Sequence, residues 1–195
     1  MRLNFKLIFI LKRTFIAIDI PLNSTVKKHI SNLRDEFRNE RIKWVEPHQY
    51  HITLQFLGSI DDSYLNPINL SLDRITSSYS QFSLSLKEFG VFKDFRNPRI
   101  LWIGFKPCEE LSKLKYAIED EMVKFNFEKS GNLFSPHLTI GRIKYLRDKQ
   151  KLKELIEEYR EKIFQKIEVK EIIFYESLLK SQGPEYVAIK KHFLS

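Results

Sequence analysis

Two short segments of the 195-residue sequence place a histidine and a threonine two positions apart. One reads His51-Ile52-Thr53-Leu54 and the other reads His137-Leu138-Thr139-Ile140. Side chains on a β-strand alternate between its two faces, so each histidine would share a face with its threonine. Each segment therefore fits a strand that buries an aliphatic face in a core and offers an imidazole and a hydroxyl to a cleft.

Two imidazoles that face one phosphate are suited to acid–base catalysis. Their unperturbed pKa of about 6.5 lets one be neutral and the other protonated near neutral pH. The neutral imidazole can take a proton from water, and the protonated one can give a proton to a departing oxygen. A threonine hydroxyl can donate a hydrogen bond to a phosphate oxygen. We therefore predict that His51, Thr53, His137 and Thr139 form a site that needs no metal and no cofactor.

The other three histidines do not share this repeated setting. His29 lies on a helical pattern, where we expect it to face solvent, and we expect His48 and His192 to be structural. A zinc site made of His48, His51 and His137 is conceivable. It has no clear fourth ligand and no supporting carboxylate motif, which disfavours it.

The spacing of the two motifs, 137 − 51 = 86 residues, recurs elsewhere in the chain. The same offset joins Pro21 to Pro107 and Arg13 to Arg99. Each proline ends a β-like run and is followed by an amphipathic helix pattern and then by a His-x-Thr strand. This repeated order indicates two related lobes in a pseudo-two-fold arrangement that brings both motifs to a common cleft.

Hydrophobic periodicity over the whole chain indicates an α+β fold. Helices are predicted at 26–37, 65–75, 111–125 and 152–163. Strands are predicted at 15–20, 51–54, 82–86, 100–105, 137–140, 167–179 and 186–193, with a turn at Gln182-Gly183-Pro184. No linker or low-complexity stretch separates independent domains, so we expect one bilobal domain over residues 1–195.

The composition is that of a folded, basic chain. Hydrophobic residues make up 43% and charged residues of mixed sign 30%, which excludes a disordered polar chain. The net charge of +8 favours an anionic partner, although many basic proteins have no nucleic-acid role. The single cysteine, Cys108, cannot form an internal disulfide, and a reducing cytoplasm fits it. The apolar run 7–11 is too short to span a membrane.

The chain resembles the RNA 2',3'-cyclic phosphodiesterases of the two-histidine phosphoesterase superfamily, formerly called 2'-5' RNA ligases. The stretches that carry this resemblance are 13–18, 44–47, 51–58, 98–102, 134–142 and 183–186. They cover nearly the whole chain from residue 13 onward. Members of this family usually begin near the position of Arg13, so residues 1–12 look like an N-terminal extension.

The resemblance implies two lobes with antiparallel sheets around a central cleft and helices on the outside. It also implies hydrolysis of a 2',3'-cyclic phosphate to a 2'-phosphomonoester, with His51 as proton donor and His137 as proton acceptor. Arg142 matches a frequent arginine and is a candidate phosphate ligand, but on an unbroken strand it would face away from Thr139. Gln55 stands where a lysine is frequent, a departure that bears on phosphate contacts.

Phe15 and Trp44 are candidates for stacking on a nucleobase, or alternatively core residues. The implied partner is RNA with a 2',3'-cyclic phosphate end, including tRNA fragments, bound by a monomer. Two alternatives remain: 2'-5' ligation of tRNA halves, and RNA binding without catalysis. The sequence contains no nucleotide-activating lysine motif and no phosphate-cradling glycine-rich loop, which favours hydrolysis over ligation.

Overall fold

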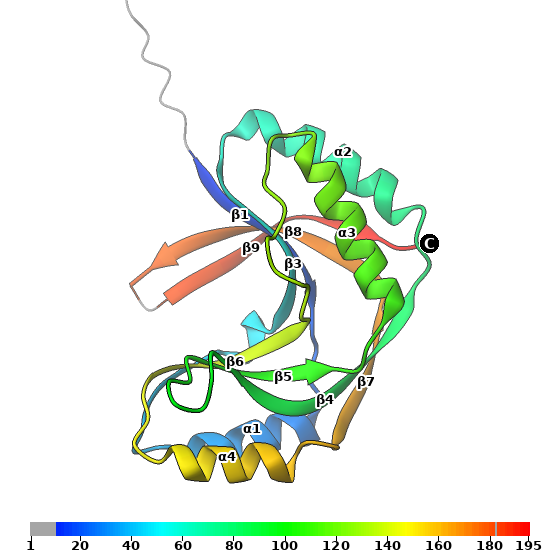
Figure 1. Cartoon of the computed structure of the whole chain (residues 1–195). Coiled ribbons are helices and arrows are strands. Elements are labelled where there is room, and N and C mark those ends of the chain that lie inside the picture. The colour runs from blue at the N-terminus through cyan, green and yellow to red at the C-terminus, as the bar shows by residue number, and fades with distance from the viewer. Residues whose placement is uncertain (1–10, 182) are drawn as a thin grey trace, which may run out of the picture.

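The computed structural model describes residues 11–181 and 183–195 and contains two antiparallel sheets (Figure 1). The four-stranded sheet has the order β3 (His51–Ile60), β1 (Lys12–Asp19), β8 (Glu171–Lys180) and β9 (Gly183–Phe193). The five-stranded sheet has the order β2 (Arg41–Trp44), β6 (His137–Tyr145), β5 (Ile100–Phe105), β4 (Phe82–Phe92) and β7 (Ile163–Val169).

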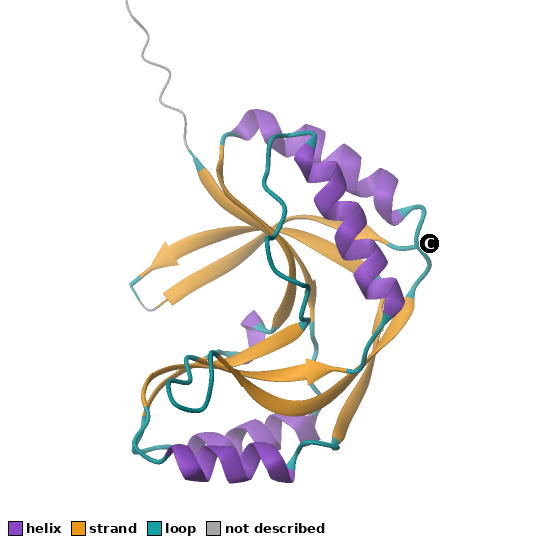
Figure 2. Cartoon of the chain, viewed as in Figure 1, coloured by secondary structure: helices purple, strands orange, loops and turns teal. Residues whose placement is uncertain are grey.

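The helices lie on the outside of these sheets (Figure 2). Helices α1 (Ser24–Glu36) and α4 (Lys149–Glu158) cover the five-stranded sheet, while α2 (Leu65–Thr76) and α3 (Glu109–Val123) pack together against the four-stranded sheet. Two short 3₁₀ helices, η1 (Pro47–Gln49) and η2 (Asp62–Tyr64), flank β3. The predicted α+β class with antiparallel sheets and outer helices is confirmed.

The two halves of the chain exchange elements between the sheets. Strand β4 follows the first His-x-Thr strand but pairs with β5, whereas β8 follows the second and pairs with β1. Helix α1 follows β1 but contacts β7, and α3 follows β5 but contacts β3. Each lobe is therefore built from both halves. The extent of the domain, 1–195, stays a prediction, because residues 1–10 lie outside the described part of the chain.

The end of the chain departs from the predicted elements. The helix predicted at 152–163 stops at Glu158, and Ile163 begins β7 with half of its side chain exposed. The single strand predicted at 167–179 is in fact two strands, β7 and β8, which meet at Lys170 and belong to different sheets. The first error arises because Ile163 continues the helical spacing of apolar residues although it is not buried. The second arises because apolar spacing does not show which sheet buries a strand.

Two predictions concern residues that the structure describes only in part. Of the extension predicted at 1–12, Lys12 already belongs to β1, and positions 1–10 lie outside the described residues. Of the predicted turn, Gln182 lies outside them, while Gly183 pairs with Lys180 and closes the β8–β9 hairpin. None of the helices between residues 11 and 195, residue 182 apart, is long and apolar enough to cross a membrane.

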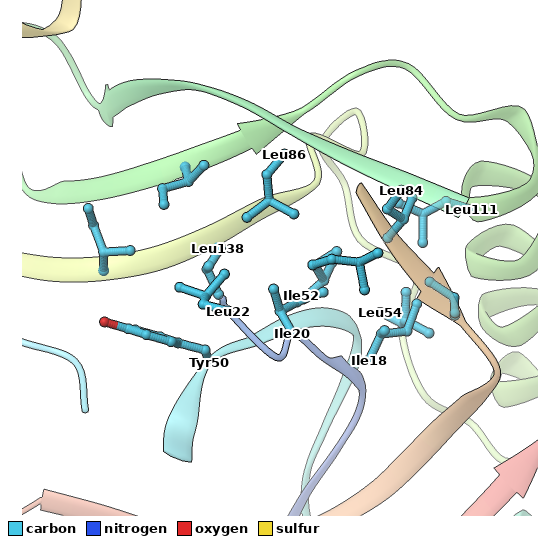
Figure 3. Packing of buried hydrophobic residues seen from close by; sticks show 14 of the residues in the cluster. Ile18, Ile20, Leu22, Tyr50, Ile52, Leu54, Leu84, Leu86, Leu111 and Leu138 are labelled. Atoms are coloured by element: carbon cyan, nitrogen blue, oxygen red, sulfur yellow. The ribbon is translucent and has the colours of Figure 1, made fainter. Parts of the chain in front are cut away.

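The aliphatic residues of the His-x-Thr strands lie in the hydrophobic core. Ile52 and Leu54 of β3 and Leu138 of β6 are at most 2% exposed and pack among side chains of β1, β4 and α3 (Figure 3). This burial fixes the direction of both strands. The histidines and threonines must therefore point to the opposite faces.

Helix α3 buries an ion pair along with its apolar residues. Lys115 and Glu119 are each 3% exposed and form a salt bridge one helical turn apart. The Glu119 carboxylate also accepts a hydrogen bond from the backbone N–H of Ser130 at 2.8 Å. The pair thus anchors the loop that leads into β6 and His137. An exposed pair with the same spacing, Glu109 and Lys113, lies on the same helix.

The two pairs make a matched stability test. Replacing Lys115 with alanine should lower the free energy of unfolding by about 3–5 kcal/mol, because Glu119 is left buried without its cation. Replacing Lys113 with alanine should change little, because water screens that exposed pair. Urea unfolding followed by circular dichroism measures both variants. Similar losses in the two would show that the burial of the Lys115 pair does not matter.

Candidate active site

Strand pairing places the two His-x-Thr motifs in matching surroundings. In the four-stranded sheet, β1 aligns Asp19 with His51 and Ala17 with Thr53. In the five-stranded sheet, β5 aligns Gly104 with His137 and Trp102 with Thr139. Both histidines and both threonines are half-buried, and β3 and β6 contact each other where the sheets meet. The fold therefore brings together the four residues that the sequence singled out.

Both strands carry a β-bulge at the same place in the repeat. In β3 the pairing with β1 skips Leu54, and in β6 the pairing with β5 skips Ile140, 86 residues later. A bulge puts two consecutive residues on one face and so reverses the alternation beyond it. Phe56 and Arg142 consequently share a face with the histidine and threonine of their own strand. This resolves the expectation that Arg142 would face away from Thr139.

The charge of Arg142 acts on both histidines. Burial is the larger cause of the lowered pKa of His51 and of His137, and the positive charge of Arg142 adds to it in both. Burial raises the pKa of Tyr186 on β9, and the same charge partly offsets that rise. Arg142 of the five-stranded sheet therefore lies close to groups of both sheets. Lys43 of β2 pairs with Arg142, and its ammonium group lies beside Gly183 at the start of β9. Cationic side chains thus gather on the side of the site that β6 contributes.

Backbone carbonyls hold the two imidazoles in the same orientation. Nδ1 of His51 donates to the carbonyl oxygen of Gln49 at 2.7 Å, and Nδ1 of His137 donates to that of Ser135 at 2.9 Å. A carbonyl oxygen can only accept, so the proton of each neutral imidazole lies on Nδ1. Nε2 of each ring is then left for proton transfer. The Gln49 side chain also donates to the carbonyl oxygen of Pro184, which ties η1 to β9.

The two histidines differ in their electrostatic environment. Burial is the main effect on each and lowers the pKa of both. The hydrogen bond to a backbone carbonyl partly offsets this lowering of the pKa in both imidazoles. Only His51 has a carboxylate that raises its pKa, that of Asp19, which accepts a hydrogen bond from the Tyr175 hydroxyl at 2.6 Å. The residue that pairs with His137 in the same way is Gly104, which has no charge.

Of the two alternatives given for Phe15 and Trp44, stacking on a base or a place in the core, the structure favours the core. Phe15 is 3% exposed, and its ring packs against His51 and Tyr186 at centroid distances of 5.1 and 4.9 Å. Trp44 pairs with Gly141 on the face opposite Thr139, and the Arg34 guanidinium lies 5.7 Å from its ring centroid. The ring of Phe15 therefore packs against the imidazole of His51, and Trp44 packs on the core side of its sheet.

Gln55 is also directed away from the site. As the second residue of the β3 bulge it is 6% exposed, and its side-chain amide donates to the carbonyl oxygen of Glu128 at 3.0 Å. The substitution of glutamine for lysine therefore does not bear on phosphate contacts here.

Sequence reasoning missed three aromatic residues near the histidines. Tyr186 packs edge-on against His51 at 5.1 Å, and Phe92 packs edge-on against His137 at 4.6 Å. Phe56 is 66% exposed and lies 6.0 Å from Phe15. The available signal for Phe56 was its offset of 86 residues from Arg142. Strict strand alternation hid that signal, because it placed both residues on the core face.

The remaining histidines lie elsewhere. His192 is buried and its Nδ1 contacts a carboxylate oxygen of Asp73 at 2.7 Å, which fits a structural role, whereas His48 is exposed. His29 is half-buried against Tyr159 and Phe164 rather than free in solvent, and it lines a cavity of about 670 Å³ between α1 and α4. Within residues 11–181 and 183–195, no three His, Cys, Asp or Glu side chains are grouped to hold a metal ion.

Known proteins match this sequence over nearly their full length. A Methanocaldococcus jannaschii protein named RNA 2',3'-cyclic phosphodiesterase is 37% identical over 179 residues, which cover 92% of this chain and 99% of the relative. A Thermotoga maritima protein of the same name is 38% identical over 181 residues, covering 89% of this chain and 91% of the relative.

Solved structures agree with these sequence relationships. The crystal structure of TT0787 of Thermus thermophilus matches with a TM-score of 0.74 and 25% identity, covering 93% of this chain and 97% of that one. E. coli LigT complexed with 3'-AMP matches with a TM-score of 0.71 and 25% identity, covering 95% and 99%. The family described as LigT like Phosphoesterase matches residues 20–102 and again 103–186, one match for each His-x-Thr motif. This chain is an enzyme that belongs to the LigT-like phosphoesterase family.

Proposed function

We propose that this enzyme hydrolyses the 2',3'-cyclic phosphate end of RNA to a 2'-phosphomonoester without a metal ion. The observation that carries the proposal is the matched pair of imidazoles, each bonded through Nδ1 to the carbonyl two residues before it. This arrangement leaves two Nε2 atoms for one proton acceptance and one proton donation. The substrate class comes from the relatives, which are named RNA 2',3'-cyclic phosphodiesterase.

In this mechanism His137 is the base and His51 is the acid. Nε2 of neutral His137 takes a proton from water as the water oxygen attacks phosphorus. The bond between phosphorus and the 3'-oxygen breaks, and protonated His51 gives its proton to that oxygen, while the 2'-oxygen stays bonded to phosphorus. Thr53, Thr139 and Arg142 donate hydrogen bonds to the non-bridging oxygens, where negative charge accumulates in the transition state.

The difference between Asp19 and Gly104 supports this division of roles. A carboxylate beside His51 favours the protonated imidazole that a donor requires. His137 pairs with Gly104, which has no charge, and no carboxylate of the described residues raises its pKa, so the protonated form of His137 lacks the support that Asp19 gives to His51. The resemblance assigned the same roles, and the local charges provide an independent reason for them.

Several finer predictions stay open. Ligation of tRNA halves would reuse the same cleft in the reverse direction, and RNA binding alone would not need both imidazoles. The tRNA-fragment substrate, the cytoplasmic location and the monomeric state stay predictions.

The first test is the reaction itself. The enzyme should convert a short RNA with a 2',3'-cyclic phosphate end into the 2'-phosphate isomer, at the same rate with and without EDTA. The product isomer can be identified by chromatography against both authentic isomers. Activity that EDTA abolishes and zinc or magnesium restores would contradict the metal-free mechanism. Joining to an added RNA through a 2'-5' bond would favour ligation instead.

The second test separates the two histidines. His51→Ala and His137→Ala should each reduce kcat by about 10²–10⁴-fold, and Thr53→Ala and Thr139→Ala by less. A cyclic substrate with sulfur in place of the 3'-oxygen releases a thiolate that needs no proton. On that substrate the His51→Ala enzyme should recover much more activity than the His137→Ala enzyme. Equal recovery of both variants would refute the assigned roles.

The third test uses pH. Burial lowers the pKa of both imidazoles, so both limbs of the kcat/KM profile, which reports the free enzyme, should lie below the ordinary value of about 6.5. The descending limb reports loss of the proton from His51, which also faces the Gln49 carbonyl, Arg142 and His137.

Asp19→Asn removes the carboxylate charge that raises the pKa of His51 but can still accept the Tyr175 hydrogen bond. The descending limb should therefore move to lower pH while the ascending limb stays in place. A shift of the ascending limb alone would mean that Asp19 acts on His137 instead.

A further inference from the structure

Arg13 lies on the same face of the four-stranded sheet as His51, but it has no role in the proposed reaction. It precedes Phe15 by two residues on β1, so its side chain shares the face that carries Phe15, Ala17 and Asp19. Asp19 pairs with His51, and six residues of strand separate Asp19 from Arg13 by about 20 Å. This distance is longer than an arginine side chain. Arg13 is therefore too far away to touch a phosphate held between the two imidazoles.

The charge of Arg13 is available to an anion. Arg13 is exposed and forms no salt bridge within residues 11–181 and 183–195. Five other arginines pair with carboxylates: Arg34, Arg74, Arg96, Arg147 and Arg160. A guanidinium stays charged at every physiological pH and carries five N–H donors. Arg99, just before β5, is exposed and unpaired within the same residues, so the surroundings of Arg13 decide what it binds.

Hydroxyl groups surround Arg13 on its face of the sheet. Ser59 of β3 pairs with Arg13, and Ser177 of β8 pairs with Tyr186 of β9. Both pairs lie at the end of the pairing between β1 and β8. Strands β3, β1, β8 and β9 lie side by side in this order, and paired residues share a face of their sheet (Figure 1). One guanidinium and three hydroxyls therefore form a row of donors suited to phosphate oxygens.

Tyr186 connects this row of donors to the catalytic residues. Its ring packs edge-on against His51 at a centroid distance of 5.1 Å. Burial raises the pKa of Tyr186, and the positive charges of Arg142 and Arg13 partly offset that rise. Both cations therefore lie near Tyr186, and the charge of Arg142 also acts on both histidines. An RNA whose cyclic end lies at His51 and Arg142 can thus bring its next phosphate to Tyr186 and Arg13.

We propose that Arg13, Ser59, Ser177 and the hydroxyl of Tyr186 form a second phosphate subsite, which binds the phosphate on the 5' side of the terminal nucleotide. The inference rests on the proposed function and adds to it the substrate class, which is RNA ends rather than cyclic mononucleotides. A cyclic mononucleotide with a free 5'-hydroxyl leaves this subsite empty, whereas any longer RNA fills it. Contacts to a backbone phosphate carry no sequence information, so the subsite accepts every base.

The test compares adenosine 2',3'-cyclic phosphate, the same nucleotide with a 5'-phosphate, and the dinucleotide ApA with a terminal 2',3'-cyclic phosphate. The wild-type kcat/KM should be about 5- to 50-fold higher for the second and third substrates than for the first, because each adds a phosphate that accepts charge-assisted hydrogen bonds. Arg13→Gln should bring both ratios close to one. Arg13→Lys should keep part of each ratio as a point charge. Tyr186→Phe retains the ring beside His51 and should lower the ratios by a smaller factor.

Arg99→Gln is the matched control. It also removes an exposed arginine at the start of a strand, but Arg99 precedes Trp102 by three residues, and Trp102 pairs with Thr139. Strand alternation therefore directs Arg99 to the face opposite Thr139. This variant should keep the wild-type ratios. Higher salt should reduce the ratios of the wild-type enzyme, because the added phosphate contact is electrostatic.

The outcomes separate the inference from the proposed function. If the wild-type enzyme opens all three substrates equally well, or if Arg13→Gln keeps the full ratios, the inference is overturned while the cyclic phosphodiesterase activity stands. If only the dinucleotide is favoured, the added nucleoside and not the phosphate is bound, which also overturns it. If Arg13→Gln loses activity equally on all three, Arg13 supports the fold and binds no phosphate. If the wild-type enzyme opens none of them, the proposed function itself fails.

Discussion

The site depends on one constraint: two strands must bury one face completely while the other face carries the polar side chains. Ile52, Leu54, Leu138 and Ile140 are almost fully buried, and burying each aliphatic side chain contributes about 1.5–3 kcal/mol. A one-residue slip of both strands would expose all four and cost on the order of 6–12 kcal/mol, comparable with the whole stability of a domain. The core therefore holds the histidines and threonines on the opposite face without any interaction among themselves.

The exchange of elements between the halves of the chain links the two lobes, because each sheet contains strands from both halves. Strand β4 completes the sheet of the second motif, and β8 completes the sheet of the first. The loops that enter the two His-x-Thr strands are then tied down separately. Gln49 bonds η1 to β9 on one side, and the buried Lys115–Glu119 pair holds Ser130 on the other. The imidazoles take their orientation from backbone carbonyls in these anchored segments, so their geometry follows from the backbone.

A nearly symmetric backbone here carries asymmetric chemistry. Strand pairing, bulges and imidazole hydrogen bonds repeat from one motif to the other, but the neighbouring side chains do not. Asp19 stands where the second half has Gly104, and Phe56 stands where it has Arg142. Hydrolysis of a cyclic ester needs a proton donor on one side and an acceptor on the other. A carboxylate beside one imidazole and an uncharged residue beside the other can give a duplicated unit one proton donor and one proton acceptor.

The sequence alone indicated most of the elements, the repeat and the two His-x-Thr motifs, because periods of 2 and 3.6 residues are local properties of a chain. It missed the short strand β2. The sequence did not determine which sheet each strand joins. The apolar run 167–179 was therefore predicted as a single strand, whereas it contains the end of β7 and most of β8, which belong to different sheets. The face of Arg142, the burial of Phe15 and the exposure of Phe56 depended on tertiary structure. A bulge arises from pairing between strands far apart in sequence, and no local pattern within one strand records where its partner skips a residue.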